Sequence, residues 1–171
     1  LLSRGKDLAP QPELATEWRL SEDRLTWTLT LREDARFADG TPLTAEDVAY
    51  TFNAAAQAGG RADLSALDVA TALDKHTVSL RLKAPRITFI DQLLTLGIVP
   101  RAERNNGYSD QYGRHPLGSG PYQLVEWQEG EQLIVERNPY FYGPTPAFER
   151  LVFLFTGEDA TLSAAHAGQV D

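Results

Sequence analysis

Three histidines are the first candidates for metal binding or acid–base chemistry, because imidazole is the side chain that titrates near neutral pH. His76, His115 and His166 lie far apart in the sequence, and none forms the i, i+3 or i, i+4 pair that would place two ligands on one helix face. The chain contains no cysteine, which excludes thiolate metal sites, disulfides and cysteine nucleophiles. We therefore expect no metal site and no cofactor.

Hydrolytic chemistry would require a positioned nucleophile or a pair of carboxyl groups with separated pKa values. Ser119 lies between two glycines, but its neighbours do not satisfy the G-x-S-x-G spacing and no base is close in sequence. The pairs Glu46–Asp47 and Glu129–Glu131 fall at a predicted helix start and a predicted turn, which favours exposed, solvated charges. We expect no catalytic residue and no enzymatic activity.

An aromatic cluster, Tyr140, Phe141 and Tyr142, follows the turn sequence Asn138-Pro139 and could stack on a ligand. Large aromatic side chains after a turn more often hold a loop against the core, because they bury a large apolar area. We favour this structural interpretation.

Composition restricts the class of protein that could carry such residues. The 171 residues are 42% hydrophobic and 23% charged, as in one globular domain. With 24 acidic against 16 basic residues the net charge is −8, so nucleic acid and anionic membrane surfaces are unfavourable partners. The chain contains no methionine, even at position 1, which suggests that the natural start and any export signal lie upstream.

The elements that would position these residues follow from two hydrophobic periods. Residues 25–31 alternate leucine or tryptophan with threonine, a pattern typical of a half-buried strand. A helix is predicted from Ala45 to Gln57, after the capping residue Thr44. A second helix after Pro85 should bury a stripe of isoleucines and leucines. The predicted hairpins join 14–20 with 25–31, 67–73 with 77–82, and 122–128 with 132–137; the buried helical stripe is Ile87, Ile90, Leu93 and Leu94.

A last strand is predicted over residues 150–155, whose continuous apolar run indicates burial on both faces. Strands and helices that do not alternate strictly favour an α/β or α+β class, with a mixed sheet, β-hairpins and flanking helices. No linker, repeat or low-complexity segment divides residues 1–171.

Four sequence strings, taken in order, resemble one family. They are PELATEWRLSEDRLTWTLTLREDARFADGTPLTAEDVAYTF (12–52), HPLGSGPYQLVEWQEGEQLIVERNPYFYG (115–143), FERLVFLF (148–155) and DATLSAAHAGQVD (159–171). Together they cover most of the chain. Their order and spacing are similar to those of the extracellular solute-binding proteins, family 5, which serve ABC importers for oligopeptides, dipeptides, nickel and metal chelates.

This resemblance implies a type II periplasmic-binding-protein fold. Residues 1–171 would form a partial N-terminal lobe, without its first strand and without the C-terminal lobe. The implied function is capture of a small peptide or a nickel or other metal chelate, for delivery to an ABC permease in the membrane. The implied location is periplasmic or extracytoplasmic, with a lipid anchor as an alternative, and the implied state is a monomer. With one wall of the cleft, the chain alone should bind ligand weakly.

The resemblance also implies ligand-binding residues. Arg61 falls near the place where nickel-chelate-binding relatives carry an arginine that grips carboxylates. Thr95, Leu96 and Gly97 fall where relatives bring the chain close to the ligand. A solvated loop arginine and a plain helix C-terminus are the competing interpretations of these positions.

Two other classes of function compete with transport. A sensor or interaction domain could use the same fold to dock a membrane partner. A small hydrolase domain would need a buried carboxylate pair or a nucleophile with a base, for which the sequence gives little support.

Overall fold

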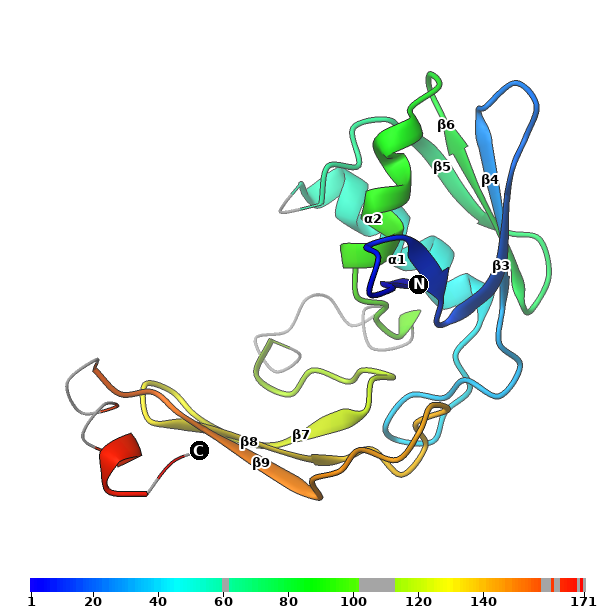
Figure 1. The fold of residues 1–171 in the computed structure, drawn as a ribbon. Helices are drawn as coiled ribbons and strands as arrows, with labels where there is room; N and C mark the ends of the chain where they lie inside the picture. The colour runs from blue at the N-terminus through cyan, green and yellow to red at the C-terminus, as the bar shows by residue number, and fades with distance from the viewer. Residues whose placement is uncertain (60–61, 102–112, 158–160, 162–163, 169, 171) are drawn as a thin grey trace.

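The computed structural model describes residues 1–59, 62–101, 113–157, 161, 164–168 and 170. Two parts meet at an angle (Figure 1). One part holds a four-stranded sheet with two helices on the face turned toward the inside of the angle, and the other part is a three-stranded sheet. A two-stranded ribbon, β1 (Leu2–Arg4) with β2 (Pro10–Pro12), lies beside the helices.

The four-stranded sheet is antiparallel, with the strand order β3-β4-β6-β5. Its inner face is apolar, because Trp27, Leu29 and Leu31 alternate with Thr28 and Thr30 on the outer face, as the sequence predicts. The two predicted hairpins are confirmed within a residue or two. The strands are β3 (Ala15–Leu20), β4 (Thr26–Leu31), β5 (Leu67–Ala72) and β6 (Thr77–Leu82).

Helix α1 (Ala45–Ala58) packs across β5 and β6. It begins with a capping box in which the backbone N–H and the hydroxyl of Thr44 both donate to Oδ2 of Asp47 at 2.9 Å. It ends where Gly59 adopts a positive φ of 69°. Val48 and Phe52 are fully buried, which confirms the predicted inner face.

The second helical segment differs from the predicted stripe. It starts as a 3₁₀ turn, η1 (Ile87–Phe89), and continues as α2 (Ile90–Thr95). Because a 3₁₀ turn has three residues per turn, the first turn is rotated relative to an α-helix, so that Phe89 is buried and Ile87 is 70% exposed. The prediction of a buried Ile87 is therefore wrong, whereas that of a buried Leu93 is confirmed.

The three-stranded sheet contains β7 (Tyr122–Gln128), β8 (Gln132–Arg137) and β9 (Arg150–Leu154), in that order. The predicted hairpin of β7 and β8 is confirmed. The prediction that the last strand is buried on both faces is wrong, because Val152, Phe153 and Leu154 are each about half exposed. Neither α1 nor α2 packs on this sheet.

All strand pairs among the described residues are antiparallel, and they belong to three separate sheets. The α/β class is confirmed. The expectation of a mixed sheet is wrong for the described residues, whose three sheets are all antiparallel. Each of the three predicted hairpins joins strands that are neighbours in sequence, and these hairpins need no parallel crossover.

A polar and aromatic corner joins the two parts. The buried Asn138 donates from its side chain to the carbonyl of Gly120 at 2.9 Å and accepts from the backbone N–H of Tyr140 at 2.9 Å. The ring of Tyr140 lies over Gly40, whose φ is 86° and where an added Cβ would be 2.9 Å from the ring carbon Cζ. The Ala38 N–H donates to the carbonyl of Gly118 at 2.9 Å.

Tyr142 completes this corner. Its hydroxyl donates to Glu13 at 3.1 Å, and the guanidinium of Arg32 lies 4.6 Å from the centre of its ring. Burial and the negative charge of Glu13 raise the pKa of the Tyr142 phenol well above its usual value, so the hydroxyl stays protonated. These contacts support the interpretation of the aromatic cluster as a structural anchor.

Candidate functional site

A pocket lies between the C-terminal end of α1 and one side of α2, with a volume of about 520 Å³. Space for it exists because α1 presents only small side chains here and because Gly59 turns the chain away from the helix. Its walls combine three apolar side chains with three polar ones. The lining residues are Ala55, Gly59, Ala62, Asp91, Gln92, Thr95 and Leu96.

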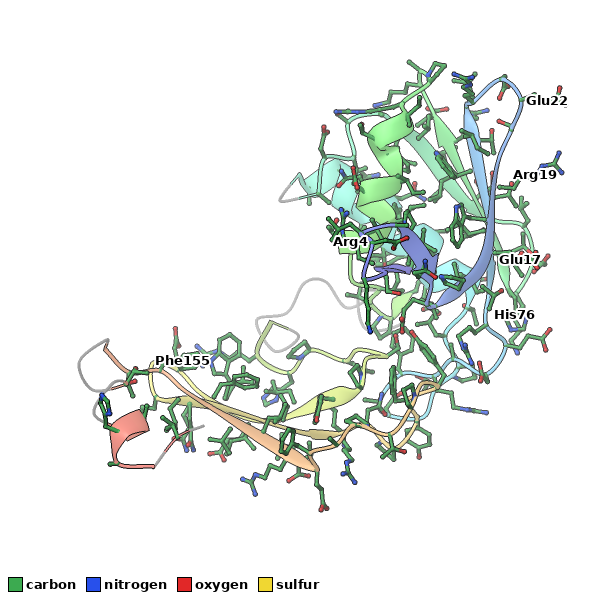
Figure 2. All side chains as sticks on the ribbon, in the orientation of Figure 1. Arg4, Glu17, Arg19, Glu22, His76 and Phe155 are labelled. Carbon is green, nitrogen blue, oxygen red and sulfur yellow. The ribbon has the colours of Figure 1, made fainter. Side chains whose placement is uncertain are left out.

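The polar groups of the pocket come from one face of α2. Asp91 accepts a hydrogen bond from Nη2 of Arg4 at 3.0 Å, and Figure 2 shows Arg4 beside this helix. The Thr95 hydroxyl donates to the backbone carbonyl of Asp91 at 3.2 Å, so its oxygen remains available as an acceptor. The side-chain amide of Gln92 makes no hydrogen bond to the described residues, and it can both donate to and accept from a ligand.

The chain that leaves α2 is fastened to α1 by buried side chains of that helix. The backbone N–H of Arg101 donates to Oδ1 of Asp47 at 2.8 Å, and the N–H of Val99 donates to the hydroxyl of Thr51 at 3.1 Å. Asp47 is only 9% exposed and Thr51 only 3%. The expectation that Asp47 is a solvated charge is wrong, because its carboxylate accepts hydrogen bonds from residues 44 and 101.

The structure brings two of the four predicted ligand-binding residues into this pocket. Thr95 and Leu96 line it. Gly97 directly follows, is exposed, and has open space where a side chain would begin. Arg61 lies outside the described residues, although its neighbours Gly59 and Ala62 both line the pocket.

Sequence reasoning missed Asp91 and Gln92 as pocket residues. A signal was present, because these two side chains and Thr95 occupy the polar side of a helix whose other side is apolar. That pattern alone does not separate a ligand-facing side from a solvent-facing side. The polar side of α2 can be recognised as part of a pocket only once the small residues of α1 are seen to lie opposite it.

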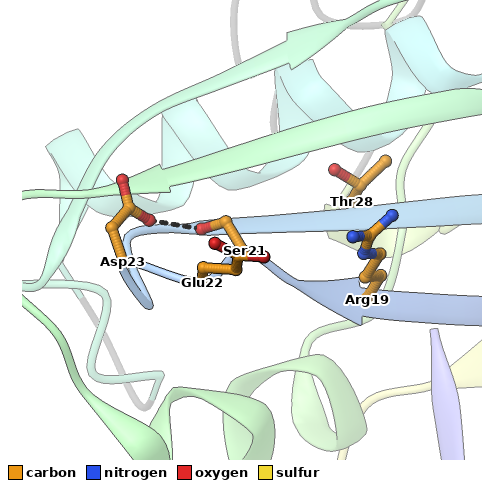
Figure 3. A pocket seen from close by; sticks show the side chains of 5 residues that line it. All are labelled: Arg19, Ser21, Glu22, Asp23 and Thr28. Carbon is orange, nitrogen blue, oxygen red and sulfur yellow. Dashed lines mark hydrogen bonds between the residues drawn. The ribbon is translucent and has the colours of Figure 1, made fainter.

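A second pocket of similar volume lies on the outer face of the four-stranded sheet, at the turn between β3 and β4 (Figure 3). Two of its polar side chains stabilise the turn itself: Ser21 donates to Asp23 at 2.5 Å, and both accept from backbone N–H groups of the turn. Because Ser21 and Asp23 are already used in the turn, and because Thr95 and Leu96 line the other pocket, we regard the pocket between α1 and α2 as the better ligand site. The lining residues of the second pocket are Arg19, Ser21, Glu22, Asp23 and Thr28.

Within the described residues, no group of three or more acidic or histidine side chains is arranged to hold a metal ion. The same part of the chain contains no helix with the length and apolar character needed to span a bilayer. His76, at the turn before β6, uses its backbone N–H to bond the Asp74 side chain at 2.8 Å.

Comparison with known protein families places most of the chain in one of them. Residues 9–171 match the family described as "Bacterial extracellular solute-binding proteins, family 5 Middle". The sequence is 37% identical over 157 residues to the "Probable D,D-dipeptide-binding periplasmic protein DdpA" of Escherichia coli, covering 87% of this chain and 30% of the relative. It is 31% identical over 175 residues to the nickel-binding periplasmic protein of Escherichia coli, covering 94% of this chain and 32% of the relative.

Solved structures share the fold. The PBP AgaA from A. tumefacien R10, solved in complex with agropinic acid, superposes with a TM-score of 0.89 at 29% identity, covering 99% of this chain and 36% of that protein. Neighbours of this kind are periplasmic binding proteins of the type II fold. The chain therefore spans about a third of the length of the proteins it matches.

Proposed function

We propose that this chain, which belongs to family 5 of the bacterial extracellular solute-binding proteins, is part of the ligand-capture subunit of an ABC importer. Residues 1–171 would form part of its N-terminal lobe, and the pocket between α1 and α2 would form one wall of the ligand cleft. The whole protein would work as an extracytoplasmic monomer that hands its ligand to a membrane permease. Family members of this type are transport proteins and not enzymes.

The observation that carries this proposal is the position of the pocket. Thr95 and Leu96, which the family resemblance implies as ligand contacts, line the same cavity as Gln92, whose side-chain amide has no hydrogen-bond partner among the described residues. A cleft with mainly small or apolar walls and a few polar groups is typical of a small-molecule site. The wall is open on one side, as expected when a second lobe closes over the ligand.

The chemistry of this wall favours a small peptide as the ligand. The Gln92 amide matches the paired donor and acceptor of a peptide group, and the Asp91 carboxylate could accept from an ammonium group or a peptide N–H. No cation lines the described part of the pocket, so an anionic ligand would have to find its charge partner elsewhere. A metal chelate is the alternative ligand, because one relative is a nickel-binding periplasmic protein. Arg61 would then bind the carboxylates of the chelator.

The test uses the full-length protein. Mass spectrometry of the ligand that co-purifies with it would identify the ligand class, and calorimetry with that ligand would give its Kd. Replacing Gln92 with alanine should weaken binding about tenfold, the effect of losing one good hydrogen bond. The control Thr28→Ala, in the other pocket, should leave the Kd unchanged. Equal Kd values for the two variants would refute the placement of the site.

A further inference from the structure

The pocket between α1 and α2 is bounded by two chain segments that the side chain of Arg86 joins to each other. Gly59 and Ala62, which follow α1, belong to one wall, and the opposite wall comes from α2. Arg86 directly precedes η1, which leads into α2. Its Nη2 donates to Oδ2 of Asp63 at 2.7 Å, and its Nη1 donates to the hydroxyl of Ser65 at 3.2 Å. One guanidinium therefore connects the residues just after Ala62 to the segment that begins the opposite wall.

The segment that Arg86 contacts is a tight turn anchored at one point. Leu64 is only 4% exposed and donates its N–H to the carbonyl of Ala62 at 3.0 Å. On either side of it, Asp63 and Ser65 are bonded to each other, because the Ser65 hydroxyl donates to Oδ1 of Asp63 at 2.6 Å. Since Arg86 binds both of these residues, it opposes rotation of the turn about the buried leucine. Such a rotation would move the adjacent Ala62.

A second ion pair close to this turn provides a comparison. Arg81 on β6 and Asp68 on β5 lie 2.6 Å apart, and their side chains are about as exposed as those of the pair formed by Arg86. The strands that carry Arg81 and Asp68 are already held together by their backbone ladder. Asp63 and Arg86 lie beyond the last ladder pair, Leu67 with Leu82, so their side chains join segments that the ladder does not.

We propose that Arg86 is a positioning residue that holds the Ala62 wall at a fixed distance from α2. The pocket of about 520 Å³ then has its width set before a ligand arrives, and side chains of the ligand that are too large for it are excluded. This inference rests on the proposed function, because it concerns the same pocket. It adds a residue outside the lining that controls which ligands fit.

Hydrogen exchange in the ligand-free, full-length protein tests whether Arg86 holds the turn. Arg86→Gln removes the ion pair to Asp63, and Arg81→Gln is the matched control within the ladder. With millisecond mixing and mass spectrometry, we expect the amides of residues 62–66 to exchange about two- to fivefold faster in Arg86→Gln, the range for loss of an exposed ion pair. The control should leave their exchange unchanged. Equal exchange in Arg86→Gln and the parent protein would overturn the proposal.

Ligand size is the second readout, with trialanine and trileucine as probes and calorimetry on the full-length protein. Arg86→Gln should lower the ratio of the trileucine Kd to the trialanine Kd by at least about threefold, because a wider pocket admits larger side chains. Damage to the fold alone would weaken both peptides equally. Faster exchange with an unchanged ratio would overturn the proposed control of ligand size.

The two readouts separate this inference from the function on which it rests. If neither peptide binds the parent protein, the proposed peptide ligand is wrong, whereas the exchange experiment still decides whether Arg86 holds the turn. If Arg86→Gln lacks the circular dichroism of the parent protein, Asp63→Asn removes the same ion pair from the other side and repeats both measurements.

Discussion

Replacing Asp47 with alanine should destabilise the protein far more than a change at the adjacent acid, Glu46. Both residues lie in the first turn of α1, and both contact Arg101. Asp47 contacts its backbone N–H and is 9% exposed, whereas Glu46 contacts its guanidinium, and both of those side chains are more than half exposed. Substitutions at these two adjacent acids therefore distinguish the loss of a buried hydrogen-bonding carboxylate from the loss of a surface ion pair.

The magnitude follows from the bonds that are lost. The Asp47 carboxylate accepts from the Thr44 N–H, the Thr44 hydroxyl and the Arg101 N–H, at 2.8 to 2.9 Å. Hydrogen bonds to a charged group contribute about 1.5 to 3 kcal/mol each, but water can replace the partners at the partly exposed Thr44. We expect Asp47→Ala to lower the free energy of unfolding by about 3 kcal/mol, mainly because it leaves the Arg101 N–H without a partner.

The control variant is Glu46→Gln. It removes an exposed ion pair, which contributes about 0 to 1 kcal/mol. Urea unfolding followed by circular dichroism measures both variants, and a loss of about 3 kcal/mol corresponds to a fall in Tm of roughly 6 to 12 °C for a chain of this size. If Asp47→Ala costs less than about 1 kcal/mol, or no more than Glu46→Gln, the buried carboxylate does not hold residues 98–101 as we infer.

A further prediction concerns stability. Gly40→Ala should lower the free energy of unfolding by about 1 to 2 kcal/mol, because φ is 86° and the new Cβ would meet the ring of Tyr140. The control Gly97→Ala, in open space, should change the free energy of unfolding by less than about 0.5 kcal/mol. Equal losses for the two variants in urea unfolding would contradict this reasoning.

Local patterns in the sequence predicted the hairpins and the first helix because their determinants lie close together in the chain. The alternation of residues 25–31 specifies which face of β4 is buried, and Thr44 and Asp47 are three residues apart. The burial of Asp47 could not be predicted in this way, since one of its partners is Arg101, 54 residues later. Thr95 and Leu96, which the family resemblance implies as ligand contacts and no local pattern singles out, line the candidate pocket, and their role in binding stays a prediction.

The error at β9 has a different physical cause. A continuous apolar run indicates a preference for burial, but it does not show which element, if any, packs on each face of the strand. The strand itself was predicted within a residue of its observed end at Leu154. The segments of β1 and β2 are only three residues each, and β2 contains two prolines, so neither gives a periodic signal.

The attachment of residues 98–101 to α1 has a consequence for how a ligand would be held. Because Val99 and Arg101 are bonded to side chains of the helix, the backbone after Thr95 and Leu96 is already ordered before any ligand arrives. A site that is arranged in advance loses less conformational entropy on binding. Recognition at this wall would then resemble docking onto a fixed template, and the conformational adjustment would fall on the ligand and on the opposing lobe.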